Sequence, residues 1–231
     1  MGYTLAMRLY PVFLSLADSR VLVVGAGKVG RRKVAGLCDA GTKEIFVFDP
    51  GLSDAETKTL LRFSGVRVFQ RTVTENDLKE CVLVFAATND PTRNRELAAL
   101  CKERNIFCNV VDDPDCGSFH VPASTRVEEL TIAFSTGGKS PALAAHLRRE
   151  SELWIERDYS SLLILLRRLR PIILNMDDNA DRHGEIFRSL VNSGLGQALA
   201  RTDRPEASRI LTALLPPSLH DRIEELLHVL C

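Results

Sequence analysis

The chain has 231 residues, 45% of them hydrophobic, which is enough to build the core of one large or two small domains. Its 30 lysines and arginines balance its 30 aspartates and glutamates, so it lacks the basic excess of nucleic-acid-binding proteins. No apolar run approaches membrane-spanning length, and the six cysteines include no C-x-x-C pair. We therefore expect a cytoplasmic protein without disulfides and with neither a nucleic-acid nor a membrane partner.

Strand-like and helix-like stretches alternate along the first half of the chain. Apolar runs at 21–24, 45–48, 66–69, 82–86 and 106–111 predict strands, and helical patterns lie between them at 28–40, 53–63, 76–80 and 91–104. Such alternation is typical of βαβ units with right-handed crossovers. The predicted fold class is therefore α/β, with a Rossmann-type parallel sheet in a dinucleotide-binding domain over residues 1–115.

A glycine-rich turn joins the first predicted strand to the first predicted helix. Gly25 allows the tight turn, Gly27 leaves room for phosphates to approach the backbone, and Gly30 lets the helix pack closely on the strand. The amides of Lys28 and Val29 point outward from the helix N-terminus, where the helix dipole favours anions. We therefore expect these residues to bind the pyrophosphate of a dinucleotide.

Asp49 ends the second predicted strand at the spacing expected for a ribose-binding carboxylate. It would accept hydrogen bonds from the ribose hydroxyls of NAD and repel the extra phosphate of NADP, with Pro50 beside it. The alternative is that Asp49 only caps the turn Asp49-Pro50-Gly51. Thr88 follows the fourth strand at the same edge of the sheet and is expected to contact the cofactor.

Polar residues also follow the fifth predicted strand. Asn109, Asp112 and Asp113 would stand at the carboxyl edge of the sheet, on the side of the glycine loop. A carboxylate beside a nicotinamide site can act as a general base. Alternatively, both aspartates only open a turn before Pro114, and the residues alone favour that reading.

The pattern changes after residue 115. Ser118–Pro122 and Leu130–Ser135 alternate like half-buried strands, and Ser140 and Pro141 suit the N-cap and first position of a helix. We expect a small α/β dimerisation and substrate segment over 116–150, and an all-helical C-terminal domain over 151–231 with breaks near Pro171, Gly184, Pro205 and Pro216-Pro217. The small segment has too few strands to bury its apolar sides alone, which predicts a homodimer.

Four motifs in combination resemble one family. They are Tyr10-Pro-Val-Phe-Leu-Ser-Leu16, Val23-Val-Gly-Ala-Gly-Lys-Val-Gly-Arg-Arg-Lys33, Asn109-Val-Val-Asp112 with Ser118-Phe-His-Val-Pro122, and Ser135-Thr-Gly-Gly-Lys-Ser-Pro141. This order and spacing resembles the precorrin-2 dehydrogenase family of sirohaem synthesis, which includes the N-terminal half of the multifunctional sirohaem synthases. The resemblance implies that the chain oxidises precorrin-2, a carboxylate-rich tetrapyrrole, to sirohydrochlorin, with NAD as hydride acceptor. Some members then insert ferrous iron.

The resemblance also implies roles for single residues. The family's catalytic aspartate maps onto Asp112 and not onto Asp113. Asn109, His120 and Lys139 are candidate substrate contacts. Lys139 is included because it lies in a glycine-rich approach to a helix N-terminus. For any single cation, the simpler alternative is that its side chain only faces solvent. No histidine or cysteine cluster has metal-ligand spacing, so no resident metal is expected. The competing hypothesis is a non-catalytic subunit that senses NAD(H). The glycine turn and Asp49 fit this hypothesis as well as they fit a dehydrogenase.

Overall fold

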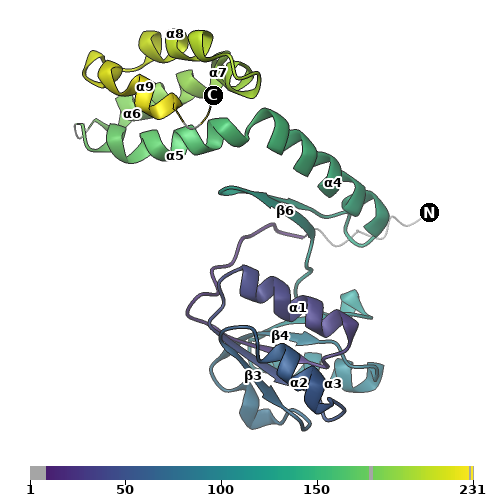
Figure 1. The fold of residues 1–231 in the computed structure, drawn as a ribbon. Helices are drawn as coiled ribbons and strands as arrows, with labels where there is room; N and C mark the ends of the chain where they lie inside the picture. The colour runs from purple at the N-terminus through teal and green to yellow at the C-terminus, as the bar shows by residue number, and fades with distance from the viewer. Residues whose placement is uncertain (1–8, 177–178, 229, 231) are drawn as a thin grey trace. The chain divides into compact units, whose positions relative to one another are not determined.

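The computed structural model describes residues 9–176, 179–228 and 230. The chain divides into two compact units, with the boundary in the sequence between Val121 and Pro122 (Figure 1). The predicted three-part division, with boundaries after residues 115 and 150, stays a prediction.

The first unit is built on a five-stranded parallel sheet in the order β3-β2-β1-β4-β5. Its strands are β1 (Arg20–Val24), β2 (Glu44–Phe48), β3 (Val66–Phe69), β4 (Cys81–Ala86) and β5 (Phe107–Val110). These bounds agree with the five predicted apolar runs to within one residue at either end. The order reverses between β1 and β4, which is the switch point where ligands of such sheets bind.

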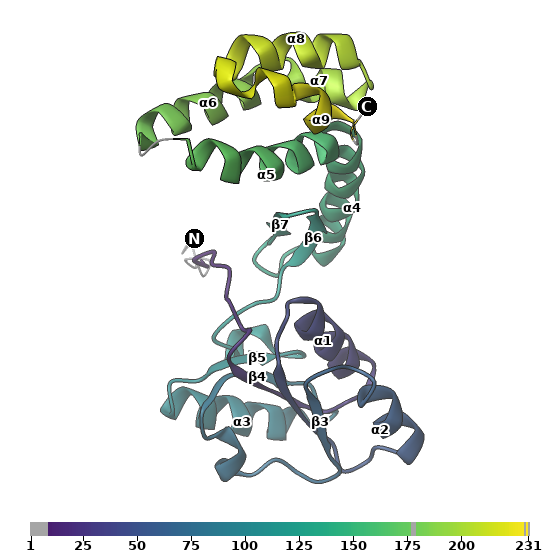
Figure 2. The ribbon, with the colours of Figure 1, turned by 60° about the vertical axis from the view of Figure 1, so that its left-hand side comes forward.

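Helices cover both faces of this sheet (Figure 2). On one face α1 (Lys28–Asp39) and α2 (Asp54–Leu60) share a core with the apolar side chains of β1 and β2. On the other face α3 (Pro91–Glu103) packs against β4 and β5, with the short 3₁₀ helix η1 (Glu75–Leu78) near one end. The central strands β1 and β4 are largely buried on both faces, which explains why they read as continuous apolar runs.

The parallel register brings the strand ends to one edge. Val24 of β1 pairs with both Phe48 and Ala86, and Ala86 pairs in turn with Val110. The residues that follow these four strand ends are therefore neighbours, although they are far apart in sequence. This edge holds the glycine loop, Asp49, Thr88 and Asp112.

One predicted strand is wrong. Ser118–Pro122 is irregular and follows the 3₁₀ turn η2 (Pro114–Cys116). The strand β6 (Ala123–Val127) begins only after Pro122 and pairs antiparallel with β7 (Leu130–Phe134). The side chains and backbone of the irregular segment bond to β5: the Cys108 N–H donates to Ser118 Oγ at 2.8 Å, and the Ser118 N–H donates to the Cys108 carbonyl at 2.8 Å. Pro122 cannot donate a strand hydrogen bond, so pairing starts after it.

The second unit packs β6 and β7 against α4 (Pro141–Asp158) and continues entirely in helices. Ser140 Oγ caps α4 by accepting from the Leu143 N–H, as predicted. The remaining helices are α5 (Ser160–Leu174), α6 (Ala180–Asn192), α7 (Leu195–Ala200), α8 (Arg204–Leu214), η3 (Pro217–Arg222) and α9 (Ile223–Leu227). Within the described part of the chain, no helix combines the length and the apolar character needed to cross a membrane.

Two of the predicted breaks in the helical region are wrong. Pro171 lies inside α5 and Gly184 lies inside α6. A proline in a helix removes one hydrogen bond, and a glycine costs about 1 kcal/mol relative to alanine. In α5 the neighbouring Leu169 and Ile173 are fully buried in the helical core, and this burial outweighs the local penalty.

Candidate functional site

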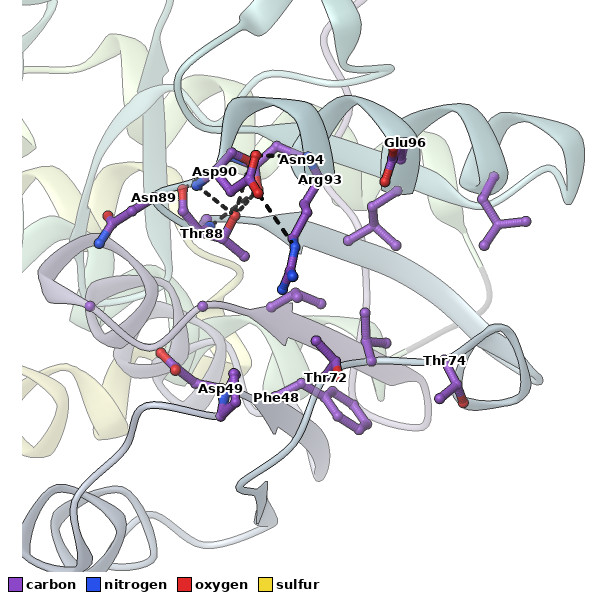
Figure 3. Close-up of a pocket in the computed structure, with 18 of the residues that line it drawn as sticks. Phe48, Asp49, Thr72, Thr74, Thr88, Asn89, Asp90, Arg93, Asn94 and Glu96 are labelled. Atoms are coloured by element: carbon purple, nitrogen blue, oxygen red, sulfur yellow. Dashed lines mark hydrogen bonds and ion pairs between the residues drawn. The ribbon is translucent and has the colours of Figure 1, made fainter.

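A pocket of about 720 Å³ opens at the carboxyl edge of the sheet in the first unit (Figure 3). Its wall comes from the glycine loop, the end of β2, the loop after β3 and the start of α3. Of the predicted cofactor residues, Gly25, Gly27, Asp49, Pro50 and Thr88 line this pocket. Lys28 and Val29 are the first residues of α1, directly after Gly27.

Each glycine of the loop has a different steric role. Gly25 has φ +93°, and a Cβ there would collide with the carbonyl of Ala87, where β4 ends. A Cβ at Gly30 would collide with the carbonyl of Gly25, so its absence lets α1 lie close to β1. At Gly27 a Cβ would meet no atom of the described residues within 4 Å, which leaves open space beside the helix N-terminus. That space fits a pyrophosphate, because it adjoins free backbone amides.

The Asp49 carboxylate links the loop to the end of β2. Its Oδ2 accepts from the Ala26 N–H at 2.8 Å, and its Oδ1 accepts from the Gly51 N–H at 2.8 Å. The turn-capping bond is therefore present, and so is a bond to the glycine loop on the pocket side. The side chain is half-buried and lines the pocket, where a ribose hydroxyl could donate to the lone pairs that remain.

Arg31 braces the same loop from α1. Its Nε donates to the Ala26 carbonyl at 2.7 Å, and its guanidinium pairs with Glu56 in the capping box of α2. The backbone and hydroxyl of Ser53, followed by Arg31, lower the pKa of Glu56 to about 2. Arg31 thus holds the loop in shape, with its charge already neutralised.

The far end of the pocket combines apolar side chains with Thr72, Thr74, Glu75 and Glu96. Phe48 from β2, Val73 from the loop after β3, and Leu97 and Leu100 from α3 line it. Figure 3 shows Arg93 reaching across from α3 toward the β2 side, with its guanidinium 3.4 Å from the carboxylate of Asp90. A planar base fits between such apolar walls, so the residues present suit both the polar and the aromatic parts of a dinucleotide.

A buried asparagine joins this pocket to Asp112. Asn94 in the first turn of α3 is 1% exposed, and its side chain bonds to Thr88 and to the carboxylate of Asp112, with 2.9 Å between Asn94 Nδ2 and Asp112 Oδ1. Asp112 itself is exposed at the sheet edge after β5. The network thus brings together the two predicted residues Thr88 and Asp112.

Asn94 was missed in the sequence, although a signal existed. Asn94, Leu97, Ala98 and Cys101 follow the i, i+3, i+4, i+7 pattern of the buried face of a helix. A polar residue in such a stripe needs hydrogen-bond partners inside the protein. Its presence there therefore indicates a buried hydrogen-bond network.

The predicted substrate contacts lie in different environments. Asn109 is 8% exposed, and its Nδ2 donates to the Phe119 carbonyl at 3.0 Å, so it holds the segment after β5 in place. His120 is half-buried, and its Nε2 has no hydrogen-bond partner among the described residues. Lys139 is exposed in the turn before α4, in the second unit. Their contact with a substrate stays a prediction.

The described residues also include no group of three or more histidine, cysteine or acidic side chains that could hold a metal ion. The absence of a resident metal remains a prediction from the sequence.

Family comparisons agree with this architecture. Residues 12–123 match the model of a family of NAD(P)-binding domains, and residues 128–150 match that of the central part of sirohaem biosynthesis proteins. The first unit is thus an NAD(P)-binding α/β domain, which confirms the predicted NAD cofactor at that level.

Individual relatives extend the match beyond these segments. The siroheme synthase of Pseudomonas fluorescens strain SBW25 is 33% identical over 205 residues, which cover 89% of this chain and 44% of that protein. Siroheme synthase 2 of Cronobacter sakazakii is 33% identical over 224 residues, covering 94% of this chain and 47% of that protein. The chain therefore spans less than half the length of these relatives. The sequence is similar to siroheme synthases over most of its length, in agreement with the resemblance carried by the combined motifs.

A solved structure supports the fold. The precorrin-2 dehydrogenase SirC aligns with a TM-score of 0.69 and 24% identity, over 89% of this chain and 98% of that one.

Proposed function

We propose that this chain oxidises precorrin-2 to sirohydrochlorin with NAD in sirohaem biosynthesis. The observation that carries the proposal is the position of the Asp112 carboxylate. It is tied by one hydrogen bond to Asn94, which itself lines the dinucleotide pocket. A carboxylate placed beside a dinucleotide site, in a chain similar to siroheme synthases, is suited to remove a proton from a substrate that is being oxidised.

The first unit's residues would bind and orient the cofactor. The amides at the start of α1 face the open space beside Gly27 and suit the pyrophosphate, and Asp49 suits a ribose with free hydroxyls. The negative charge of Asp49 disfavours a phosphate on that ribose, so we propose NAD rather than NADP. NAD supplies, when bound, a two-electron acceptor for one hydrogen of the substrate.

Asp112 would accept the second hydrogen as a proton. The oxidation removes two hydrogens from precorrin-2, one with its bonding electrons and one without, so the balance needs a base for the latter. Asp112 is exposed at the sheet edge, where a large substrate can reach it. His120 and Lys139 are each proposed to contact carboxylates of the substrate.

We also propose that the chain works as a homodimer through its second unit. The two-stranded sheet of β6 and β7 has no further strand at either side within the described residues. Along α4, the side chains of Leu143, Leu147, Leu153 and Trp154 are exposed. Open strand edges and apolar side chains on one unit favour pairing with a second copy. Sedimentation should give a dimer at micromolar concentration, and a fully active monomer would refute this.

The test of the function is anaerobic incubation with precorrin-2 and NAD, followed by absorbance spectra before and after adding ferrous iron. We expect sirohydrochlorin and NADH in equal amounts from the wild type. Asp112→Asn should bind NAD nearly as well but lose turnover by roughly 10²–10⁴-fold, the usual range for loss of a general base. Asp113→Asn is the matched control, because the neighbouring carboxylate is not the proposed base.

The outcomes separate the two hypotheses. Turnover that survives in Asp112→Asn would remove Asp112 from the role of base. NAD binding without any oxidation of precorrin-2 by the wild type would instead favour a subunit that senses NAD(H). A spectral change on adding ferrous iron would assign iron insertion as a second activity.

A further inference from the structure

The side chain of Asn94 lies buried between the dinucleotide pocket and the proposed base. It is 1% exposed and sits in the apolar stripe of α3 beside Leu97, Ala98 and Cys101. An amide at such a position is unfavourable unless its hydrogen bonds are made. The hydrogen bonds of the Asn94 side chain therefore indicate what role the residue has at this position.

All four hydrogen-bonding positions of this amide are used. Its oxygen accepts from the Thr88 N–H at 3.2 Å and from Thr88 Oγ1 at 2.7 Å. Its nitrogen donates to the Thr88 carbonyl at 3.1 Å and to Asp112 Oδ1 at 2.9 Å. A side-chain amide has two donors and two acceptor lone pairs, so no capacity remains.

This arrangement also fixes which way the amide points. If the amide were rotated by half a turn, its NH₂ would face the Thr88 N–H, and two donors would oppose each other. The donor that faces Asp112 is therefore set by Thr88, a residue of the pocket wall. Figure 3 shows Asn94 and Thr88 side by side at the start of α3, joined by these bonds.

The bond leaves one oxygen of the base free. Asn94 engages Oδ1 of Asp112, whereas Oδ2 makes no hydrogen bond among the described residues. A carboxylate held by one oxygen cannot swing freely about its side-chain torsions, and its second oxygen keeps a fixed direction in which to accept a proton. Correct placement of a reacting group to within about 1 Å is worth up to ~10²-fold in rate.

We propose that Asn94 is a positioning residue that sets the Asp112 carboxylate at a fixed distance from the dinucleotide site. It acts through Asp112 and does not itself touch the reacting atoms. This inference rests on the proposed function, because it assigns Asn94 a part in the same oxidation.

The first test is Asn94→Leu, which keeps the size of the side chain and removes all its hydrogen bonds. We expect kcat at saturating NAD and precorrin-2 to fall by about 10–100-fold, following the cost of misplacing a reacting group. Ala98→Gly is the matched control: it weakens the same helix next to the network, outside the pocket wall, and should keep the wild-type kcat. A purely structural role for Asn94 would lower stability in both variants and leave kcat unchanged in both.

A second variant, Asn94→Asp, gives a readout that a structural role would not move. One of its oxygens can still accept from Thr88, but the other faces Asp112 and can donate only when it is protonated. The kcat of Asn94→Asp relative to wild type should therefore rise as the pH is lowered. A ratio that stays constant with pH would overturn the proposal.

A measurement without cofactor or substrate tests the bond itself. The side-chain amide signals of Asn94, followed by ¹⁵N NMR, should move when Asp112 is changed to Ala and stay in place in Asp113→Ala. Unmoved signals in Asp112→Ala would overturn the proposal. If the wild type binds NAD but does not oxidise precorrin-2, the proposed function is wrong. If the wild type oxidises precorrin-2 and Asn94→Leu has the same kcat as the wild type, only the positioning role of Asn94 is wrong.

Discussion

Gly27→Ala should separate cofactor binding from folding. Gly27 is the N-cap of α1 with φ −63° and ψ −172°, a conformation open to any residue, and the added Cβ would meet no described atom within 4 Å. Alanine restricts the unfolded chain, which stabilises the fold by ~0.4–1 kcal/mol, but it is a poorer N-cap than glycine. These opposing effects are similar in size, so we expect the free energy of unfolding to change by less than about 1 kcal/mol.

The effect on NAD should be much larger. The methyl group would stand in the space beside the N–H groups of Lys28 and Val29, where a phosphate must approach to within ~2.7–3.2 Å to be hydrogen-bonded. Each lost bond to a charged acceptor costs about 1.5–3 kcal/mol. Loss of one or two such bonds corresponds to a dissociation constant for NAD that is higher by roughly 10–10⁴-fold, at about 1.4 kcal/mol per factor of ten.

The assay pairs a titration of NAD by fluorescence or calorimetry with urea unfolding of the same samples. Gly25→Ala is the contrasting variant, because its φ of +93° and the collision with the Ala87 carbonyl should destabilise the protein itself. If Gly27→Ala binds NAD as tightly as the wild type, the open space beside the loop is not where the pyrophosphate lies, and the reasoning is refuted.

Three further predictions concern charges and thiols. Asp49→Ala should weaken NAD binding by roughly 1.5–3 kcal/mol and narrow its preference over NADP, measured by titration of both; an unchanged preference would mean that Asp49 only holds the turn. Glu56→Gln should lower the melting temperature at pH 7, because the pKa of Glu56 is held at about 2 in the folded state and its contribution is present above the ordinary value of 4.5. That difference should shrink as the pH falls from 4.5 toward 2, and a pH-independent difference would contradict it. Burial raises the pKa of Cys81 to about 11, so this thiol should resist iodoacetamide at pH 8 in the folded protein, whereas the exposed Cys116 should react. Cys116 should react faster in Asp113→Asn, because that variant lacks the carboxylate that raises the pKa of Cys116. Mass spectrometry of the labelled peptides checks both expectations.

The fold of the first unit was predictable because each element carries a strong local signal. Strands buried on both faces appear as uninterrupted apolar runs, and the glycine turn marks the passage from β1 to α1. The second unit was harder. The strand predicted at Ser118–Pro122 lies at Ala123–Val127 instead, as the half-buried β6. Ser118–Pro122 alternates like a strand in sequence, but Ser118 bonds to β5 and the segment is irregular. Proline and glycine are local signals, and the core of the helical region overrides them at Pro171 and Gly184.

The candidate site was predictable for residues that lie just after the strands of the sheet. Gly25, Asp49, Thr88 and Asp112 all follow a strand of the parallel sheet, so topology alone brings them to one edge. Asn94 comes from within a helix, and its partners lie 6 and 18 residues away in sequence. The helical stripe marks Asn94 as a buried polar residue, but no local motif identifies its partners, because they depend on how α3 docks against the sheet.

The segment after β5 bears on how well the edge of the sheet is protected. As the last strand in the order, β5 would present a free row of N–H and carbonyl groups, the surface on which unrelated chains stack into aggregates. Ser118 bonds to the backbone N–H and carbonyl of Cys108 in that row, and the Phe119 carbonyl accepts from the side-chain amide of Asn109. The opposite border is the four-residue β3, which carries Arg67. A bonded segment on one border and a short, charged strand on the other are the features that make a sheet edge a poorer template for the pairing of foreign strands.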